Sequence, residues 1–435
     1  MELAAPAGNM EKLRCALIYG ADAVYAGAER FSLRARADNF SFAELGIAVR
    51  EARHNKKRFY LAINAFCNDA MLHDLREFLE ALAASPRDTQ PDALIISDLG
   101  AMRVAARVIP QIPIHISTQA NTLNAEAARF YHEYFGARRI ILARELSLAE
   151  IAAFARAVPE LEIEVFAHGA MCVAYSGRCI LSSYLTSPSF LAPGEALPGN
   201  PDRIRSASYG DCAHACRWSY SLVEEKREGV VLHIGEDAQG TTLLSSRDLA
   251  LIDHLAELRD AGVNAVKIEG RMKSLHYTAV TAGVYRAALD ALAAGRNPSD
   301  QERAFWREEL QALSRRELTT GFLFPDNRAR LPSRGAETMP RLMMAIVLRK
   351  EESMGEGFWR CRAANALRPG AELSAIMPGM IRVPAFAYTL FSPGGGEISL
   401  VRAGEECIMR SDAPLAAMAI LRQAAARAVF STKLQ

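Results

Sequence analysis

The sequence predicts an α/β fold, a (β/α)8 TIM-like barrel followed by a small C-terminal β-barrel domain. Three observations predict it. Apolar strand-like segments alternate with helix-like segments eight times before residue 300. The turn after the first of these strands lacks the G-x-G-x-x-G motif that open dinucleotide-binding sheets usually carry. After residue 343, short strand-like segments are separated by Pro-Gly and Gly-rich turns, a pattern typical of a small antiparallel barrel.

The eight predicted barrel strands are short apolar segments of the kind that parallel sheets bury on both faces. Because parallel strands need crossover connections, eight strand–helix units favour a closed barrel. The strands are predicted at residues 2–5, 23–26, 59–64, 92–97, 114–118, 139–143, 162–167 and 265–269.

Helix-start and helix-stop signals lie between the strands. Ser41 with Glu44, and Ser147 with Glu150, have the spacing of a capping box. Gly20 and Gly136 fit the position after a helix end. The predicted helices cover residues 12–18, 41–53, 71–84, 100–108, 124–135, 147–158, 248–261 and 274–294.

The predicted domains are a barrel over residues 1–330, a linker over 331–342, and a small β-barrel with its tail over 343–435. A cysteine-bearing insertion of about residues 169–247 interrupts the first domain, and residues 219–224 and 230–234 could form a hairpin within it. A further helix is predicted near 301–314, and the Ala-rich stretch 415–430 is predicted to be helical.

Composition limits the classes of function. Half of the 435 residues are hydrophobic and 23% are charged, as in globular proteins. The net charge of +1 gives no global signal for nucleic acid, so RNA contacts must use local patches. We expect a cytoplasmic protein, because the N-terminus shows no secretory signal and no apolar run has the ~20 residues of a membrane span.

Four of the eight cysteines form a candidate metal site. Cys172, Cys179, Cys212 and Cys216 follow the spacing C-x6-C-x32-C-x3-C. Structural zinc sites usually use C-x2-C pairs, whereas an iron–sulfur cluster accepts ligands from more widely spread positions. The spacing favours an iron–sulfur cluster, and zinc or four unconnected buried thiols remain the alternatives. The scattered Cys15, Cys67, Cys361 and Cys407 are interpreted as core residues.

Polar residues follow the predicted strands at the carboxyl ends, where barrel enzymes place their active sites. We predict catalytic roles for His168 and Glu269, although His168 could instead donate a hydrogen bond to a metal ligand. Arg144 and Arg271 are predicted to bind carboxylates. The predicted substrate-binding residues are Asn64, Gln119, Arg144 and Arg271. For each of them helix capping or solvation of the barrel mouth is the alternative.

Familiar hydrolase motifs are absent from the sequence, which has no G-x-S-x-G, no H-E-x-x-H and no P-loop. Its densest basic run is Arg50, Arg53, Lys56, Lys57 and Arg58. Such a run is more often a solvated helix face than a phosphate-binding surface, and both interpretations stay open here.

The segment EVFAHGAMCVAYSGRCILS, residues 164–182, resembles the signature of the U32 (collagenase-like) peptidase family. The segments ELAAPAGN (2–9), GADAVYAG (20–27) and KIEGR (267–271) are similar to that family as well. The resemblance covers roughly residues 1–330 and extends to the C-terminal domain. The chain departs from the family pattern in its long segment between Cys179 and Cys212.

The resemblance implies a 4Fe-4S cluster on Cys172, Cys179, Cys212 and Cys216. It is strongest to members that hydroxylate tRNA wobble uridine to 5-hydroxyuridine with prephenate as co-substrate. The implied partners are tRNA, a small dicarboxylate and an electron donor, with the basic runs and the C-terminal domain contacting tRNA. A collagenase-like peptidase, or hydroxylation of ribosomal RNA or a ubiquinone precursor, are the alternatives that the family offers.

Overall fold

The computed structural model describes residues 1–32, 38–171, 213, 247–314, 316–324, 341–370 and 372–424, together with the backbone of two short strands, β8 (Gly235–Asp237) and β9 (Gly240–Thr242). Several predictions lie outside these residues. They are the four candidate cluster cysteines, the hairpin at 219–234, and most of the insertion and the linker.

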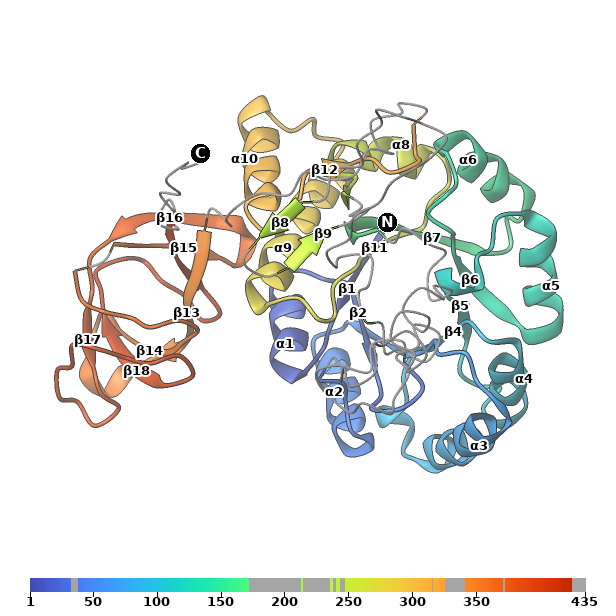
Figure 1. The fold of residues 1–435 in the computed structure, drawn as a ribbon, viewed down its shortest axis with the longest axis horizontal. Coiled ribbons are helices and arrows are strands. Elements are labelled where there is room, and N and C mark those ends of the chain that lie inside the picture. Colours follow the sequence, from blue (N-terminus) through green and yellow to red (C-terminus); the bar gives the residue numbers. More distant parts are fainter. Residues whose placement is uncertain are drawn as a thin grey trace, which may run out of the picture. The chain divides into compact units, whose positions relative to one another are not determined.

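Eight parallel strands close into a barrel (Figure 1), which confirms the predicted fold class. Each strand pairs with the next in sequence order, and the last strand pairs with both the seventh and the first. At the closure, Leu3 lies opposite Val266, and Val266 lies opposite Val165. The strands are β1 (Glu2–Pro6), β2 (Ala23–Gly27), β3 (Arg58–Ile63), β4 (Ala93–Ile96), β5 (Ile114–Ile116), β6 (Ala137–Ile141), β7 (Glu162–Ala170) and β11 (Ala265–Ile268).

Helices surround the barrel (Figure 1), and most of them bury an apolar face. The two predicted capping boxes are both present: Ser41 and Ser147 each accept from the backbone of a glutamate three residues on, and that carboxylate accepts from the serine backbone N–H. The helices are α1 (Met10–Ile18), α2 (Phe42–His54), α3 (Asp69–Ala84), α4 (Leu99–Val108), α5 (Ala125–Phe135), α6 (Leu148–Ala157) and α8 (Leu255–Asp260).

The predicted helix over 248–261 is wrong in its first half. Residues Asp248–Ala250 form strand β10, which pairs antiparallel with the end of β7 and parallel with β12 (Leu318–Thr319). A 3-10 turn (Ile252–His254) then leads into α8. Leu249, Ile252 and Leu255 have helical spacing, but the exposed edge at the end of β7 offers backbone hydrogen bonds that outweigh this local preference.

A second compact unit contains residues 18–20, 274–315 and 336–435. Its helices are α9 (Leu275–Ala293) and α10 (Asp300–Gln311). Its seven-stranded antiparallel sheet has the order β16-β15-β19-β13-β14-β18-β17 and encloses one apolar core. The strands are β13 (Arg341–Lys350), β14 (Phe358–Ala363), β15 (Leu373–Met377), β16 (Ile381–Phe386), β17 (Thr389–Phe391), β18 (Glu406–Arg410) and β19 (Ile420–Ala424).

Strand β19 corrects the prediction of a helix over 415–430. Its residues pair with both β13 and β15, so they occupy the interior of the sheet. Ile420 and Leu421 are fully buried there. Tertiary packing therefore overrides the helix propensity of the alanines. The residues after Ala424 are outside the described part of the chain.

One buried carboxylate connects α10 to the sheet within the second unit. Glu309 is fully buried and forms ion pairs with Arg341, Arg382 and Arg422. Burial opposes its ionisation, but the hydrogen bond and charge of Arg422 outweigh burial, and the pKa of Glu309 falls to about 2. Glu309 is therefore charged at neutral pH, and its three arginines neutralise it.

Across the described part of the chain, none of the helices is both long and apolar enough to span a membrane.

Candidate functional site

The carboxyl ends of the barrel strands enclose a small polar pocket in the first unit. It gathers five of the six non-cysteine residues predicted for the site: Asn64, Gln119, Arg144, Glu269 and Arg271. They meet there because parallel strands end at the same rim of the barrel. The pocket is lined by Tyr25, Ala62, Asn64, Ile95, Ser117, Thr118, Gln119, Ile141, Arg144, Phe166, Lys267, Glu269 and Arg271.

Amide and hydroxyl groups on one side of the pocket form hydrogen bonds with one another and with the main chain. Asn64 follows β3, and its Nδ2 donates to Gln119 Oε1 at 3.1 Å. Ser117 Oγ donates to the same oxygen. Thr118 Oγ1 donates to the main-chain oxygen of Leu142 at 2.9 Å, which ties the end of β5 to the end of β6. This side of the pocket is therefore pre-ordered by hydrogen bonds.

The other side of the pocket is cationic. The Arg144 guanidinium lies over the Phe166 ring, 4.1 Å from its centroid. Lys267 Nζ lies 4.0 Å from the centroid of the Tyr25 ring. Arg271 is buried as well, at 4% exposure. The described lining thus holds three cations and one carboxylate, Glu269, and this excess of positive charge makes the pocket a candidate site for an anionic ligand.

Lys267 was not predicted, and it connects the pocket to a buried chain of charges inside the barrel. Its Nζ donates to Glu164 Oε1 at 2.8 Å, and the other oxygen of Glu164 accepts from Arg139 at 2.9 Å. Arg139 also donates to Glu2 at 2.6 Å. The sequence signal was available, because Glu164 and Lys267 each interrupt an otherwise apolar strand segment.

The buried charged groups shift one another's pKa values. Burial opposes ionisation of Glu164, but the charges of Lys267 and Arg139 outweigh it and lower the pKa of Glu164 to about 2. Burial also lowers the pKa of Lys267, and Glu164 counteracts that change. Glu164 is therefore a carboxylate at neutral pH that favours the charged ammonium of Lys267 at the pocket.

His168 lies on β7 but is not among the residues that line the pocket. Its main-chain oxygen accepts from the N–H of Glu269 at 2.8 Å. The imidazole is 2% exposed, and burial lowers its pKa to about 4, although Asp248 opposes this change. The side chain is therefore neutral at pH 7, which excludes a role as an imidazolium acid there.

Two glycines leave the space that Arg271 occupies. A Cβ at Gly27 would lie 2.6 Å from Ser32 Oγ and closer still to the Arg271 guanidinium. A Cβ at Gly8 would collide with the main-chain oxygen of Arg271.

The pocket itself has a volume of about 40 Å3, far below the several hundred Å3 of typical ligand sites. An organic ligand therefore needs side chains such as Arg144 to move.

The four predicted cluster ligands, Cys172, Cys179, Cys212 and Cys216, lie outside the described residues, although β7 ends at Ala170, just before the first of them. Within the described ranges, no group of His, Cys, Asp and Glu has the arrangement of a metal site. The core interpretation is confirmed for the buried Cys15, Cys361 and Cys407, whereas Cys67 is partly exposed.

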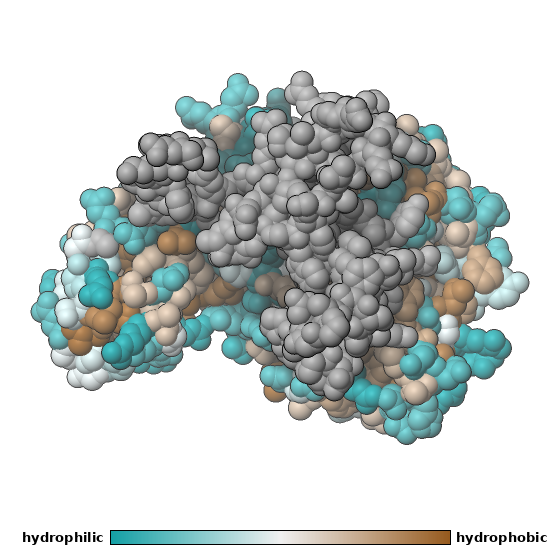
Figure 2. Space-filling view, in the orientation of Figure 1, coloured by the Kyte–Doolittle hydropathy of each residue, from teal (hydrophilic) through white to brown (hydrophobic). Residues whose placement is uncertain are grey.

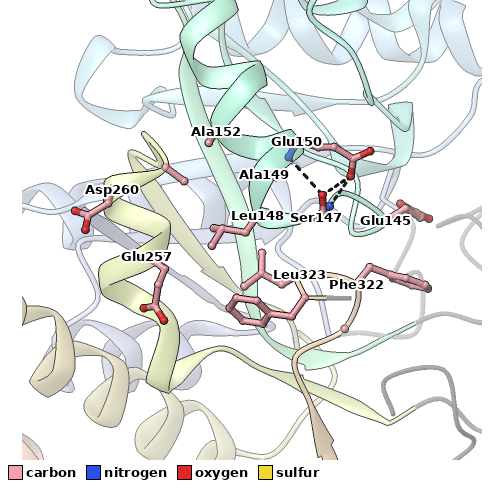
Figure 3. Close-up of a pocket in the computed structure, with 13 residues that line it drawn as sticks. Glu145, Ser147, Leu148, Ala149, Glu150, Ala152, Glu257, Asp260, Phe322 and Leu323 are labelled. Atoms are coloured by element: carbon pink, nitrogen blue, oxygen red, sulfur yellow. Dashed lines mark hydrogen bonds between the residues drawn. The ribbon is translucent and has the colours of Figure 1, made fainter. Parts of the chain in front are cut away.

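A larger groove of about 860 Å3 lies outside the barrel between α6, α8 and residues 321–324 (Figure 3). Its floor is apolar and includes Leu148, Phe322 and Leu323, while Glu145, Glu150, Glu257 and Asp260 supply carboxylates. None of the described residues that line it is basic. The groove therefore does not suit a carboxylate or phosphate ligand, and the smaller pocket is the better candidate for anion binding.

The densest basic run is largely neutralised. Four of its five cations pair with carboxylates: Arg50 with Asp88, Arg53 with Asp92, Lys57 with Asp22 and Arg58 with Glu2. These pairs favour the interpretation of the run as a solvated, ion-paired surface. The run by itself gives no support to an RNA-binding role.

Comparison with known proteins identifies the family of this chain. The model of peptidase family U32 matches residues 8–332. The chain is 37% identical over 361 residues to "tRNA hydroxylation protein P" of Escherichia coli, with 74% of each chain covered. It is 34% identical to the protein of the same name in Helicobacter pylori J99, with 97% of this chain and 98% of that one covered. It is 31% identical to a "Collagenase" of Porphyromonas gingivalis, over 74% of this chain and 73% of that one. The chain therefore belongs to peptidase family U32.

Proposed function

We propose that this chain is an RNA-modifying protein that hydroxylates tRNA wobble uridine to 5-hydroxyuridine, with prephenate as co-substrate. The observation that carries the proposal is the cationic pocket at the carboxyl ends of the strands. Relatives named as tRNA hydroxylation proteins support the substrate class. A "23S rRNA 5-hydroxycytidine C2501 synthase" of Escherichia coli, 35% identical over 67% of this chain and 40% of that one, supports RNA hydroxylation more broadly.

In this proposal the pocket binds the dicarboxylate. Arg144 and Arg271 bind its carboxylates, for which a guanidinium offers paired donors. Lys267 adds a third positive charge, held in place by Glu164 at 2.8 Å. Asn64 and Gln119 bind neutral oxygens of the ligand, and Glu269 is the carboxylate placed to accept a proton.

Cys172, Cys179, Cys212 and Cys216 would hold a 4Fe-4S cluster, because four thiolates form its usual ligand set. When bound, the cluster would supply electron transfer. The chain's own residues bind and orient the ligand, and the buried position of Lys267 and Arg271 keeps water from the cations.

A peptidase activity is the second candidate, because relatives are named "Collagenase" and "Uncharacterized protease MJ0090". The pocket does not favour it. None of the described residues that line it is a histidine, so Ser117 and Thr118 have no histidine base within the pocket. Both hydroxyls also donate to neighbouring oxygens.

The deciding experiment is mass spectrometry of tRNA nucleosides from a strain that lacks the gene. We expect 5-hydroxyuridine to disappear, and to return with the wild-type gene but not with Arg144→Ala. Arg103→Ala, an exposed arginine on α4, is the matched control and should restore the nucleoside. Unchanged 5-hydroxyuridine in the deletion strain would reject the tRNA assignment. Gelatin cleavage by the purified chain that survives loss of Cys172 would favour the peptidase.

A further inference from the structure

The outer face of the C-terminal sheet carries arginines and phenylalanines across four neighbouring strands, β13, β14, β18 and β17. Side chains alternate between the two faces of a strand. Val347, Cys361, Met409 and Leu390 belong to the apolar core, which defines the inner face of these strands. Their immediate neighbours Arg360, Arg410 and Phe391 therefore point outward, and so does Phe358, two residues before Arg360. A bulge in β13 between Val347 and Arg349 places Arg349 opposite Arg360, on the same outer face. Figure 2 shows hydrophobic and hydrophilic residues side by side on this unit.

The outward residues form one contiguous group. Phe358 lies opposite Arg410, Arg349 lies opposite Arg360, and Phe391 lies opposite Ile408. The Phe358 and Phe391 rings are 5.6 Å apart between centroids, and the Arg410 guanidinium lies 5.8 Å from the Phe358 centroid. We call Arg349, Phe358, Arg360, Phe391 and Arg410 the arginine–phenylalanine face.

The charge of this face is positive. Glu351 and Glu406 pair with Arg360, at 2.8 Å and 3.6 Å. Arg349 and Arg410 are both exposed, and neither has a carboxylate within 4.0 Å among the described residues. Two exposed guanidiniums thus lie on the same face of the sheet as two half-buried aromatic rings.

We propose that the arginine–phenylalanine face binds single-stranded RNA, such as a loop of the tRNA substrate. Proteins that bind unpaired nucleotides combine aromatic rings, on which bases stack, with cations that contact the phosphates. Phe358 and Phe391 supply the rings, and Arg349 and Arg410 supply the cations. This inference rests on the proposed function for its choice of RNA, and it concerns a surface distinct from the pocket residues.

The test measures affinity without turnover. A fluorescein-labelled tRNA transcript is titrated with the full chain at several salt concentrations, and binding is followed by anisotropy. Arg349→Glu/Arg410→Glu is compared with Arg368→Glu/Arg402→Glu, a control that makes the same charge change at exposed positions off these strands. Each lost phosphate contact lowers the salt slope by roughly 0.7, so the face variant should lower it by roughly 1.4.

Phe358→Leu keeps an apolar side chain but removes the ring. We expect affinity for the transcript to fall by about fivefold or more, because a base loses its stacking partner. Circular dichroism checks that the variant is folded. Equal affinities and salt slopes for the face variant and its control would overturn the proposal, even if a protein partner were found there. Weaker binding by the face variant alone supports it, whether or not the chain hydroxylates uridine.

Discussion

Replacing Glu164 by glutamine tests the buried charge chain that supports the pocket. The substitution keeps the shape of the side chain but removes its negative charge. Glu164 is fully buried, and its carboxylate lies 2.8 Å from Lys267 and 2.9 Å from Arg139. Glutamine would leave two buried cations with less compensation, which is costly where water cannot solvate them.

Two independent estimates give the loss of stability expected for Glu164→Gln. The difference between an ordinary glutamate pKa of 4.5 and the value of about 2 for Glu164 corresponds to roughly 3 kcal/mol. Breaking a buried ion pair by removing one partner costs about 3–5 kcal/mol. Because the pKa is lowered on folding, this stabilisation is present above pH 4.5 and is lost as the pH falls toward 2.

Hydrogen–deuterium exchange at pH 7 is the assay, read on peptides from β7 and β11. Glu162→Gln is the matched control, since Glu162 lies on the same strand and also pairs with Arg139 but is 49% exposed. Exposed pairs contribute about 1 kcal/mol or less. We expect Glu164→Gln to lower the opening free energy of these strands by about 3 kcal/mol, and Glu162→Gln to lower it by less than 1 kcal/mol.

Equal losses of protection for the two variants would refute the reasoning, because burial would then not decide the cost. A second check is Glu164→Gln/Lys267→Met. Removing the cation together with its partner should cost less than the sum of the two single changes. Additive costs would show that Glu164 and Lys267 are not coupled.

Three further predictions follow from other sites. Glu309→Gln should lower the unfolding free energy of the second unit by about 3 kcal/mol, whereas the exposed Glu308→Gln should cost less than 1 kcal/mol. Denaturant titration followed by tryptophan fluorescence, with Trp306 in α10 and Trp359 in β14 both in the second unit, measures this, and equal midpoints would contradict it. His168→Gln should leave the pH dependence of activity between pH 6 and 8 unchanged, because the pKa of His168 is about 4; loss of a kinetic pKa near 6.5 would contradict this. Cys172→Ser should sharply reduce the bound iron and sulfide measured after anaerobic purification, while Cys67→Ser should not; equal iron in both would argue against the predicted ligand.

The sequence predicted the barrel well because each of its strands is a short apolar segment between capped helices. Segment 92–97 illustrates this, since β4 is buried at all four of its positions and lies between the predicted helices over 71–84 and 100–108. The pocket residues could be predicted for the same reason. Once strands are parallel, the residue after each strand must lie at one rim, so Asn64, Gln119 and Arg144 meet without any need for a motif.

The wrong and missed predictions share a physical cause. Each depends on pairing between residues far apart in the sequence, which local sequence patterns do not reveal. Strands β10 and β19 have helical composition, yet each completes a ladder with a strand remote in the chain. Glu164 and Lys267 are 103 residues apart, and only their pairing across adjacent strands makes two buried charges acceptable. The phosphate interpretation of the basic run lost support in the same way, since Asp22, Asp88, Asp92 and Glu2 come from other elements.

Gly27 shows how a residue without any functional group can control the ligand pocket. Its hydrogen atoms define the distance at which the Arg271 guanidinium can settle, so the smallest added methyl group would displace a charge from the cavity. The side-chain volume at position 27 thus limits where the Arg271 guanidinium can lie. A library randomised there should rank variants by side-chain volume rather than by polarity, because any added side chain would shift Arg271.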